Sequence, residues 1–183
     1  MSNLDPFSPR INPVWPEAGA LRIEDLAIGM KAISDRVITE ADVALFAALS
    51  GDKNPVHLDE SYAQGTLFQG RIVHGMFSAS LLSAVIANQL PGPGSIYLSQ
   101  TLTFLAPVRI GDCVGAEVTV TDVELDRMRV SLQTVCRVGD RVVLDGSATI
   151  LMQTSCPQQS TDCLVIRQVM HNASCPAAEP TAG

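Results

Sequence analysis

The pattern of apolar and polar residues divides the chain into a helical part followed by a β-rich part. Residues 39–51, TEADVALFAALSG, place apolar side chains at helical spacing, with Thr39 and Asp42 able to cap the start of a helix. Residues 75–90, GMFSASLLSAVIANQL, are apolar nearly all round, which predicts a helix buried in the middle of the domain. Pro91 follows at once and should end this helix.

The segments after this helix alternate in polarity or are rich in β-branched residues, which is typical of strands. Short turns separate four such segments, at residues 95–108, 112–125, 128–138 and 141–154. Consecutive strands with short turns predict an antiparallel meander, and residues 31–38 predict one earlier strand.

One buried helix with a run of long antiparallel strands predicts an α+β fold, a long central helix wrapped by an antiparallel sheet. Because such a sheet has two edges, we expect an edge strand to pair with a second copy of the chain, which gives a homodimer.

The composition suits one folded domain with a core of Leu, Val, Ile and Ala. The chain has 183 residues, of which 46% are apolar and only 4% aromatic. We predict a proline-rich N-terminal arm at residues 1–20, a single domain at 21–153, and a partly disordered tail at 154–183. Within the tail, DCLVIRQVM could form one more strand or helix.

Charge and cysteine usage exclude several classes of partner. The net charge of -7 argues against nucleic acid, since phosphate backbones require clustered Lys and Arg. No apolar run reaches the length of a membrane span, and the N-terminal stretch lacks the pattern of a signal peptide. The cysteines form no C-x-x-C pair and are odd in number, so we expect reduced thiols in a cytoplasmic protein and no zinc site: Cys113, Cys136, Cys156, Cys163 and Cys175.

The loop SGDKNPVH, residues 50–57, is the first candidate for chemistry. Gly51 is placed to be the left-handed residue after the helix, and Pro55 forces the residue before it away from helical angles. Such a stiff loop can hold Asp52 and His57 in a fixed relation, and a carboxylate beside an imidazole can move protons. The same residues are also ordinary turn chemistry, so spacing alone leaves both interpretations open.

His74 and Gly75 form the second candidate, because they stand at the start of the buried helix. A helix N-terminus offers free backbone N–H groups and the positive end of the helix dipole, which can stabilise a carbonyl oxygen that gains negative charge. The alternatives are a helix-entry glycine and a structural histidine.

Two segments resemble one enzyme family. FAALSGDKNPVHLD resembles the hydratase-2 motif of the MaoC-like, (R)-specific enoyl-CoA hydratases, and residues 70–112 resemble the segment that follows it there. The likeness covers roughly Leu26 to Met152. It implies the hot-dog fold, usually as a dimer, and a hydro-lyase that needs no metal or redox cofactor, with coenzyme A as part of its acyl-CoA substrate.

The resemblance also implies roles for residues. Asp52 and His57 correspond to the catalytic pair, and the N–H of Gly75 to the oxyanion donor. The supporting residues would be Asn54, which orients the loop, His74, and Ser83, for which Ser80 is a rival. The implied reaction is reversible syn hydration of a trans-2-enoyl thioester to the (R)-3-hydroxyacyl thioester.

Substrate-binding residues and the exact substrate are less determined. Leu67, Phe68 and Val73 are candidates for an apolar acyl tunnel or for plain core. Lys53, Arg71 and Arg109 could bind the coenzyme A phosphates or form a solvated surface.

Three rival functions remain open at this point. They are a dehydratase acting on acyl-carrier-protein, branched or dicarboxylic thioesters, a non-catalytic hot-dog acyl-CoA binder, and a hot-dog thioesterase. Chain length and pathway, whether polyhydroxyalkanoate precursor supply or fatty acid metabolism, are also open.

Overall fold

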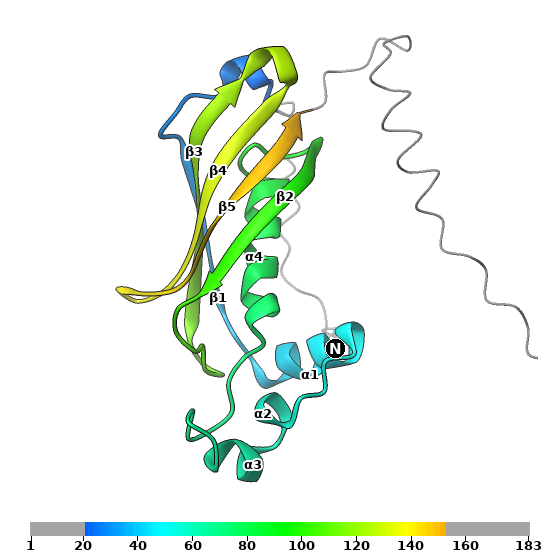
Figure 1. Ribbon diagram of the computed structural model, residues 1–183, viewed down its shortest axis with the longest axis vertical. Helices are drawn as coiled ribbons and strands as arrows, with labels where there is room; N and C mark the ends of the chain where they lie inside the picture. Colours follow the sequence, from blue (N-terminus) through cyan, green and yellow to red (C-terminus); the bar gives the residue numbers. More distant parts are fainter. Residues whose placement is uncertain (1–20, 153–183) are drawn as a thin grey trace, which may run out of the picture. The chain divides into compact units, whose positions relative to one another are not determined.

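The computed structural model describes residues 21–152, so the predictions for the arm and the tail lie outside it. One sheet of five antiparallel strands curves around a long helix (Figure 1), which confirms the α+β prediction. In chain order the strands are β1 (Lys31–Val37), β2 (Ser95–Phe104), β3 (Cys113–Glu124), β4 (Arg129–Val138) and β5 (Arg141–Met152).

The predicted meander is correct for β3, β4 and β5 and wrong for β2. The spatial order is β1-β3-β4-β5-β2, so β2 pairs with β5 at the far edge. The reason lies in residues 105–112, which do not fold back as a tight turn. The carbonyl of Val108 accepts from the Val73 N–H, and Ile38 donates to the carbonyl of Asp112. These bonds carry the chain from one edge of the sheet to the other.

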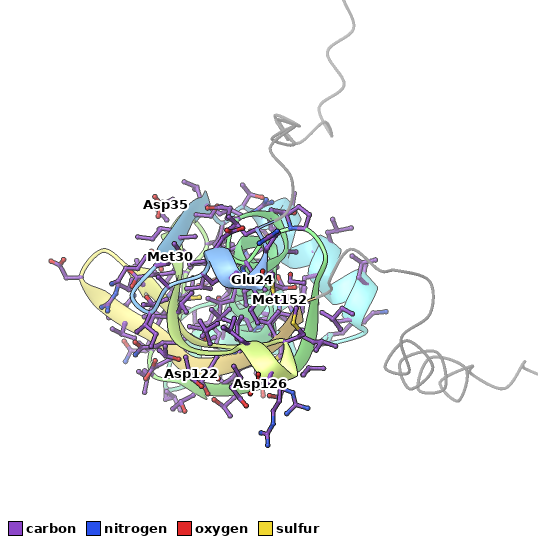
Figure 2. All side chains as sticks on the ribbon, turned by 90° about the horizontal axis from the view of Figure 1, so that it is seen from above. Glu24, Met30, Asp35, Asp122, Asp126 and Met152 are labelled. Atoms are coloured by element: carbon purple, nitrogen blue, oxygen red, sulfur yellow. The ribbon has the colours of Figure 1, made fainter. Side chains whose placement is uncertain are left out.

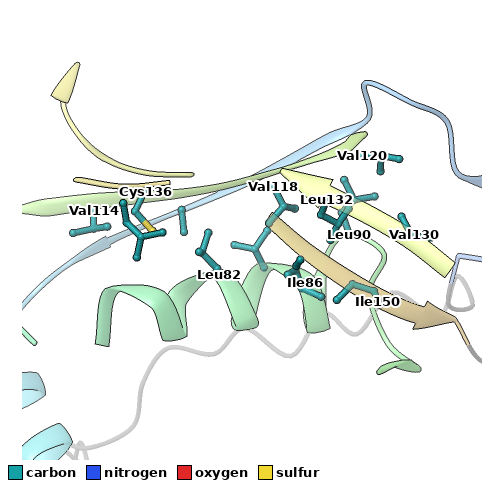
Figure 3. Close-up of a cluster of buried hydrophobic side chains, with 14 of the residues drawn as sticks. Leu82, Ile86, Leu90, Val114, Val118, Val120, Val130, Leu132, Cys136 and Ile150 are labelled. Carbon is teal, nitrogen blue, oxygen red and sulfur yellow. The ribbon is translucent and has the colours of Figure 1, made fainter. Parts of the chain in front are cut away.

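Helix α4 (Gly75–Asn88) packs on one face of the sheet. Figure 3 shows Leu82 and Ile86 directed toward Val118 of the sheet, and all three are at most 1% exposed. The prediction of a buried helix is correct for the face of α4 toward the sheet, while the other face is exposed within residues 21–152, because the sheet covers only one side. Met76, on the opposite side, is 56% exposed.

Seen from the end of the sheet that carries Asp126 (Figure 2), side chains fill the space between the curved sheet and α4. The buried core consists mainly of Val, Leu, Ile and Ala, as the composition predicted. Two short 3-10 helices are also present: Ile23–Asp25 precedes β1, and Leu125–Arg127 joins β3 to β4. No helix within residues 21–152 is long and apolar enough to cross a membrane.

Three shorter helices, α1 (Glu40–Ser50), α2 (Pro55–Leu58) and α3 (Glu60–Gln64), gather at the end where α4 begins (Figure 1). Helix α1 starts with the predicted capping box, in which the Asp42 N–H donates to Thr39 Oγ1 at 3.2 Å and the Thr39 N–H donates to the Asp42 carboxylate at 2.9 Å. It ends at Gly51 with φ 77°, which confirms the left-handed C-cap.

Candidate active site

The loop that follows α1 is held by its own polar groups. The Asn54 N–H donates to Oδ1 of Asp52 at 3.2 Å, and the Val56 N–H donates to Oδ1 of Asn54 at 3.2 Å. Asn54 therefore caps α2, whose first residue is Pro55. The predicted stiffness of this loop has a direct structural basis in these bonds.

His57 is buried, with 8% of its surface exposed. Its Nδ1 donates to the carbonyl oxygen of Ile72 at 2.9 Å. Because a carbonyl can only accept, this bond places the proton of the neutral ring on Nδ1 and leaves Nε2 as an acceptor. Burial lowers the pKa of His57 below its usual value. The charge of His74 adds to this decrease, while the Ile72 bond and the charge of Asp52 oppose it.

The carbonyl of Ile72 is itself held in place by the surrounding chain. The Ile72 N–H donates to the carbonyl of Val56 at 3.2 Å. The guanidinium of Arg109 donates to the carbonyls of Arg71 and Phe68. Residues 68–73 are thus clamped against α2 and against the segment after β2, which fixes the acceptor that orients His57.

His74 is the cap residue of α4 and is 1% exposed. Its ring stacks on that of His57 with centroids 3.9 Å apart and planes inclined by 32°. Its Nε2 donates to the main-chain carbonyl of Asp52 at 3.0 Å. The ring of Phe46, from α1, packs on it at 5.1 Å.

Gly75 is the first residue of α4. The ring of Phe104, at the end of β2, lies so close that a Cβ on Gly75 would stand 2.7 Å from Cε1 of Phe104. Any larger residue would displace the ring or the helix start. The Phe77 N–H donates to the carbonyl of His74 at 3.0 Å. The N–H groups of Gly75 and Met76, which precede it, have no acceptor within the helix, so they can bind a ligand oxygen.

Asp52, His57 and His74 bring a carboxylate oxygen and two ring nitrogens within 4.8 Å of one another. Among residues 21–152 this is the one cluster with the spacing of metal ligands, although one nitrogen of each ring already forms a hydrogen bond to a carbonyl. The same spacing suits a single water, because a water bonded to two acceptors at about 2.8 Å spans up to about 5.6 Å. The cluster can therefore hold a water beside a free helix N–H.

The structure does not bring the predicted supporting serine to this cluster. Ser83 is exposed and stands eight residues beyond Gly75 in the helix, or about 12 Å along its axis. Ser80 is also exposed, and its hydroxyl donates to the carbonyl of Phe77 at 2.6 Å. The roles assigned to Asp52, His57, Gly75 and these serines stay predictions.

The predicted substrate-binding residues differ in how far their side chains are exposed. Val73 is 3% exposed and belongs to the main core, whereas Leu67 is 85% exposed and Phe68 lies between these extremes. Lys53 is exposed beside Asp52.

Arg71 forms ion pairs with Glu40 at 2.6 Å and Glu60 at 3.5 Å. Its guanidinium is thus already engaged within the chain, as is that of Arg109. The main-chain acceptor of Ile72 and the ring of Phe104 had no signal in the sequence, because both act through contacts between distant segments.

Comparison with known proteins gives the family. Residues 26–141 match the family described as MaoC like domain. The chain belongs to this MaoC-like family. The match covers α1 to α4 and the strands up to the start of β5, so the cluster around Asp52 lies within the family domain.

Relatives within the MaoC-like family are close in sequence. The chain is 49% identical over 135 residues to the 3-hydroxybutyryl-CoA dehydratase of Methylorubrum extorquens, covering 74% of this chain and 86% of that protein. It is 50% identical over 129 residues to the (R)-specific enoyl-CoA hydratase of Rhodospirillum rubrum, covering 70% of this chain and 90% of that protein.

A solved structure described as the (R)-hydratase from A. caviae involved in PHA biosynthesis superposes with a TM-score of 0.69 at 44% identity. The superposition covers 71% of this chain and 99% of that one. These findings confirm the hot-dog fold and the resemblance on which the predicted roles depend.

Proposed function

We propose that this chain is an (R)-specific enoyl-CoA hydratase, which adds water reversibly to trans-2-enoyl-CoA and forms (R)-3-hydroxyacyl-CoA. The observation that supports this proposal is that the loop with Asp52 and His57 lies against the start of α4. An acid/base pair and a free N–H at a helix start are the groups that addition of water to an unsaturated thioester requires.

The pair acts on one water. With the proton of His57 on Nδ1, its Nε2 accepts from the water, and the Asp52 carboxylate accepts the second hydrogen. One O–H bond breaks as the oxygen bonds to the β-carbon, and the pair takes the proton. A proton then returns to the α-carbon on the same face, which makes the addition syn. Such general acid–base catalysis contributes about 10²–10⁴-fold.

The start of α4 acts on the thioester. As the β-carbon is attacked, the carbonyl oxygen takes up negative charge and becomes enolate-like. The Gly75 N–H stabilises this oxygen, and the helix dipole adds to the effect. The Phe104 ring over Gly75 closes one side of this position. We propose that the reaction needs no metal or redox cofactor, since every proton transfer has a side chain to perform it.

The experiment is a spectrophotometric assay of the purified full chain with crotonyl-CoA. We expect loss of the enoyl absorbance and chiral analysis that gives the (R)-hydroxy product. Asp52→Asn should lower the rate by about 10²–10⁴-fold while circular dichroism shows an unchanged fold. Release of free thiol would instead indicate a thioesterase, and turnover of carrier-protein thioesters alone would indicate a different dehydratase.

We further propose that the active form is a homodimer joined along β2. Strand β2 is an edge strand, and Leu98 and Phe104 on it are 46% and 53% exposed. Exposed strand edges pair readily with another chain. Light scattering should give twice the mass of the chain, and a charged residue in place of Leu98 should shift it toward the monomer.

A cytoplasmic location is part of the same proposal. Its support is the cysteine usage: Cys113 and Cys136, within the described residues 21–152, are free thiols, and reduced thiols are usual in the cytoplasm. Fractionation of cells that express the full chain would test it, and recovery outside the cytoplasm would contradict it.

A further inference from the structure

His74 touches both members of the acid/base pair and precedes the oxyanion glycine. Its Nε2 lies 3.0 Å from the carbonyl of Asp52, and its ring lies 3.9 Å from that of His57. With 1% of its surface exposed, it is one of the most buried polar side chains in the described part of the chain. Yet the water addition proposed above assigns it no proton transfer.

We propose that His74 is a positioning residue that holds Asp52 and His57 against the start of α4. This inference rests on the proposed hydratase function and names a further residue of the same site. It assigns His74 two separate tasks. One belongs to Nε2, which bonds to Asp52, and the other to the ring, which stacks on His57.

The first task belongs to Nε2. The carbonyl of Asp52 can only accept, so Nε2 carries the proton of the His74 ring and donates it. Asp52 itself is exposed, and the loop bonds around it run within residues 50–56. The bond to His74 is therefore what ties the main chain of Asp52 to α4. Without this bond the Asp52 carboxylate would remain in a well-formed loop but lose its fixed position relative to Gly75.

The second task belongs to the ring. The His74 ring packs against two other rings, those of His57 and Phe46, whose centroids lie 3.9 Å and 5.1 Å from its own. It thus keeps the His57 ring in the plane that its Ile72 bond requires. The charged groups that face His57 are Asp52 from the loop and His74 from the start of α4, and they act on its pKa in opposite directions.

Two amide variants separate the tasks. In His74→Gln the amide nitrogen stands the same number of bonds from Cα as Nε2, so it can still donate to Asp52. In His74→Asn the amide nitrogen stands where Nδ1 stood and cannot reach. Both variants remove the ring, and both keep a polar amide, so each is the matched control of the other.

We expect kcat of His74→Asn to fall about 100-fold, the effect of an active-site group misplaced by about 1 Å. The kcat of His74→Gln should fall by less, because the ring is lost in both variants but the donor to Asp52 only in His74→Asn. KM should change little in either. In both variants NMR titration should find the pKa of His57 moved upward, since the charge of His74 that lowers it is gone. Thermal unfolding of each variant reports whether the domain is intact.

Equal loss of kcat in the two variants would overturn the first task, and an unmoved His57 titration would overturn the second. If His74→Asn does not fold, His74→Ala replaces it as the variant without a donor. The NMR titration does not depend on turnover. If the natural chain fails to hydrate crotonyl-CoA, the proposed function is refuted. The titration would still test the contact between His57 and His74.

Discussion

The segment from α1 to α3 and the layer of α4 on the sheet are held together in different ways. In the first, caps and turn bonds hold the loop that carries Asp52, and large apolar side chains such as Leu45 and Leu49 are 60% and 78% exposed. In the second, Val114, Val130 and Ile150 are fully buried. The segment that supplies Asp52 and His57 is thus fixed by local polar bonds, while the fold depends on apolar burial.

This difference predicts that chemistry and stability can be changed separately. Buried apolar contacts supply most of the free energy of folding, and a polar loop beside the start of α4 supplies little of it. The contacts of His74 and Gly75 lie where the two regions meet, and there a change should affect both properties.

The largest effect should come from His57→Gln. We expect kcat/KM to fall by about 10²–10⁴-fold, because the ring that accepts a proton from water is lost. The melting temperature should change little by comparison. The matched control is Asp122→Asn, an exposed site on the outer surface (Figure 2), which should leave both quantities unchanged. A large loss of stability with His57→Gln would contradict the prediction that chemistry and stability can be changed separately.

Leu82→Ala should lower stability and leave the catalytic rate nearly unchanged. Leu82 is 1% exposed in the core under the sheet, so its truncation should lower the free energy of unfolding by about 2–5 kcal/mol. The activity per folded molecule should persist. Urea unfolding measures the first and titrated active sites the second. Leu49→Ala, the same change at a 78% exposed position of α1, should alter stability by no more than about 0.5 kcal/mol.

Gly75→Ala tests the junction between the regions. The added methyl would meet the ring of Phe104 at 2.7 Å, so the start of α4 must shift, and we expect kcat/KM to fall about 100-fold. Adding Phe104→Ala removes the obstacle while the backbone N–H stays. The double variant should recover part of the activity relative to Gly75→Ala, as a double-mutant cycle measures. Full activity in Gly75→Ala alone would contradict the close contact.

The smallest effect is the pH dependence of stability that His57 contributes. Its pKa is lowered in the folded chain, so just below the usual pKa of about 6.5 the unfolded chain binds more protons. Stability should therefore be fully present above that pH and decline as the pH falls toward the folded pKa. Urea unfolding of the natural chain and of His57→Gln at several pH values would show a weaker decline in the variant. An identical decline would mean that other groups cause it.

Much of the architecture could be predicted from local pattern. The cap at Thr39, the left-handed Gly51, the extent of α4 and the strand segments depend on residues a few positions apart, so their signals lie in the sequence itself. The partner of β2 could not be predicted in this way. Turn length between consecutive strands does not reveal that residues 105–112 pair with Val73 and Ile38 instead of folding back.

The site shows the same division. The sequence by itself determined the stiff loop with Asp52 and His57, the start of a helix at Gly75 and, through the motif, the family. Only the tertiary structure decided that the Ile72 carbonyl sets the tautomer of His57, that His74 bonds to Asp52 and stacks on His57, and that Phe104 requires a glycine at residue 75. The physical reason is range: capping and turn bonds act within a few residues, whereas these contacts join segments that only the packed core brings together.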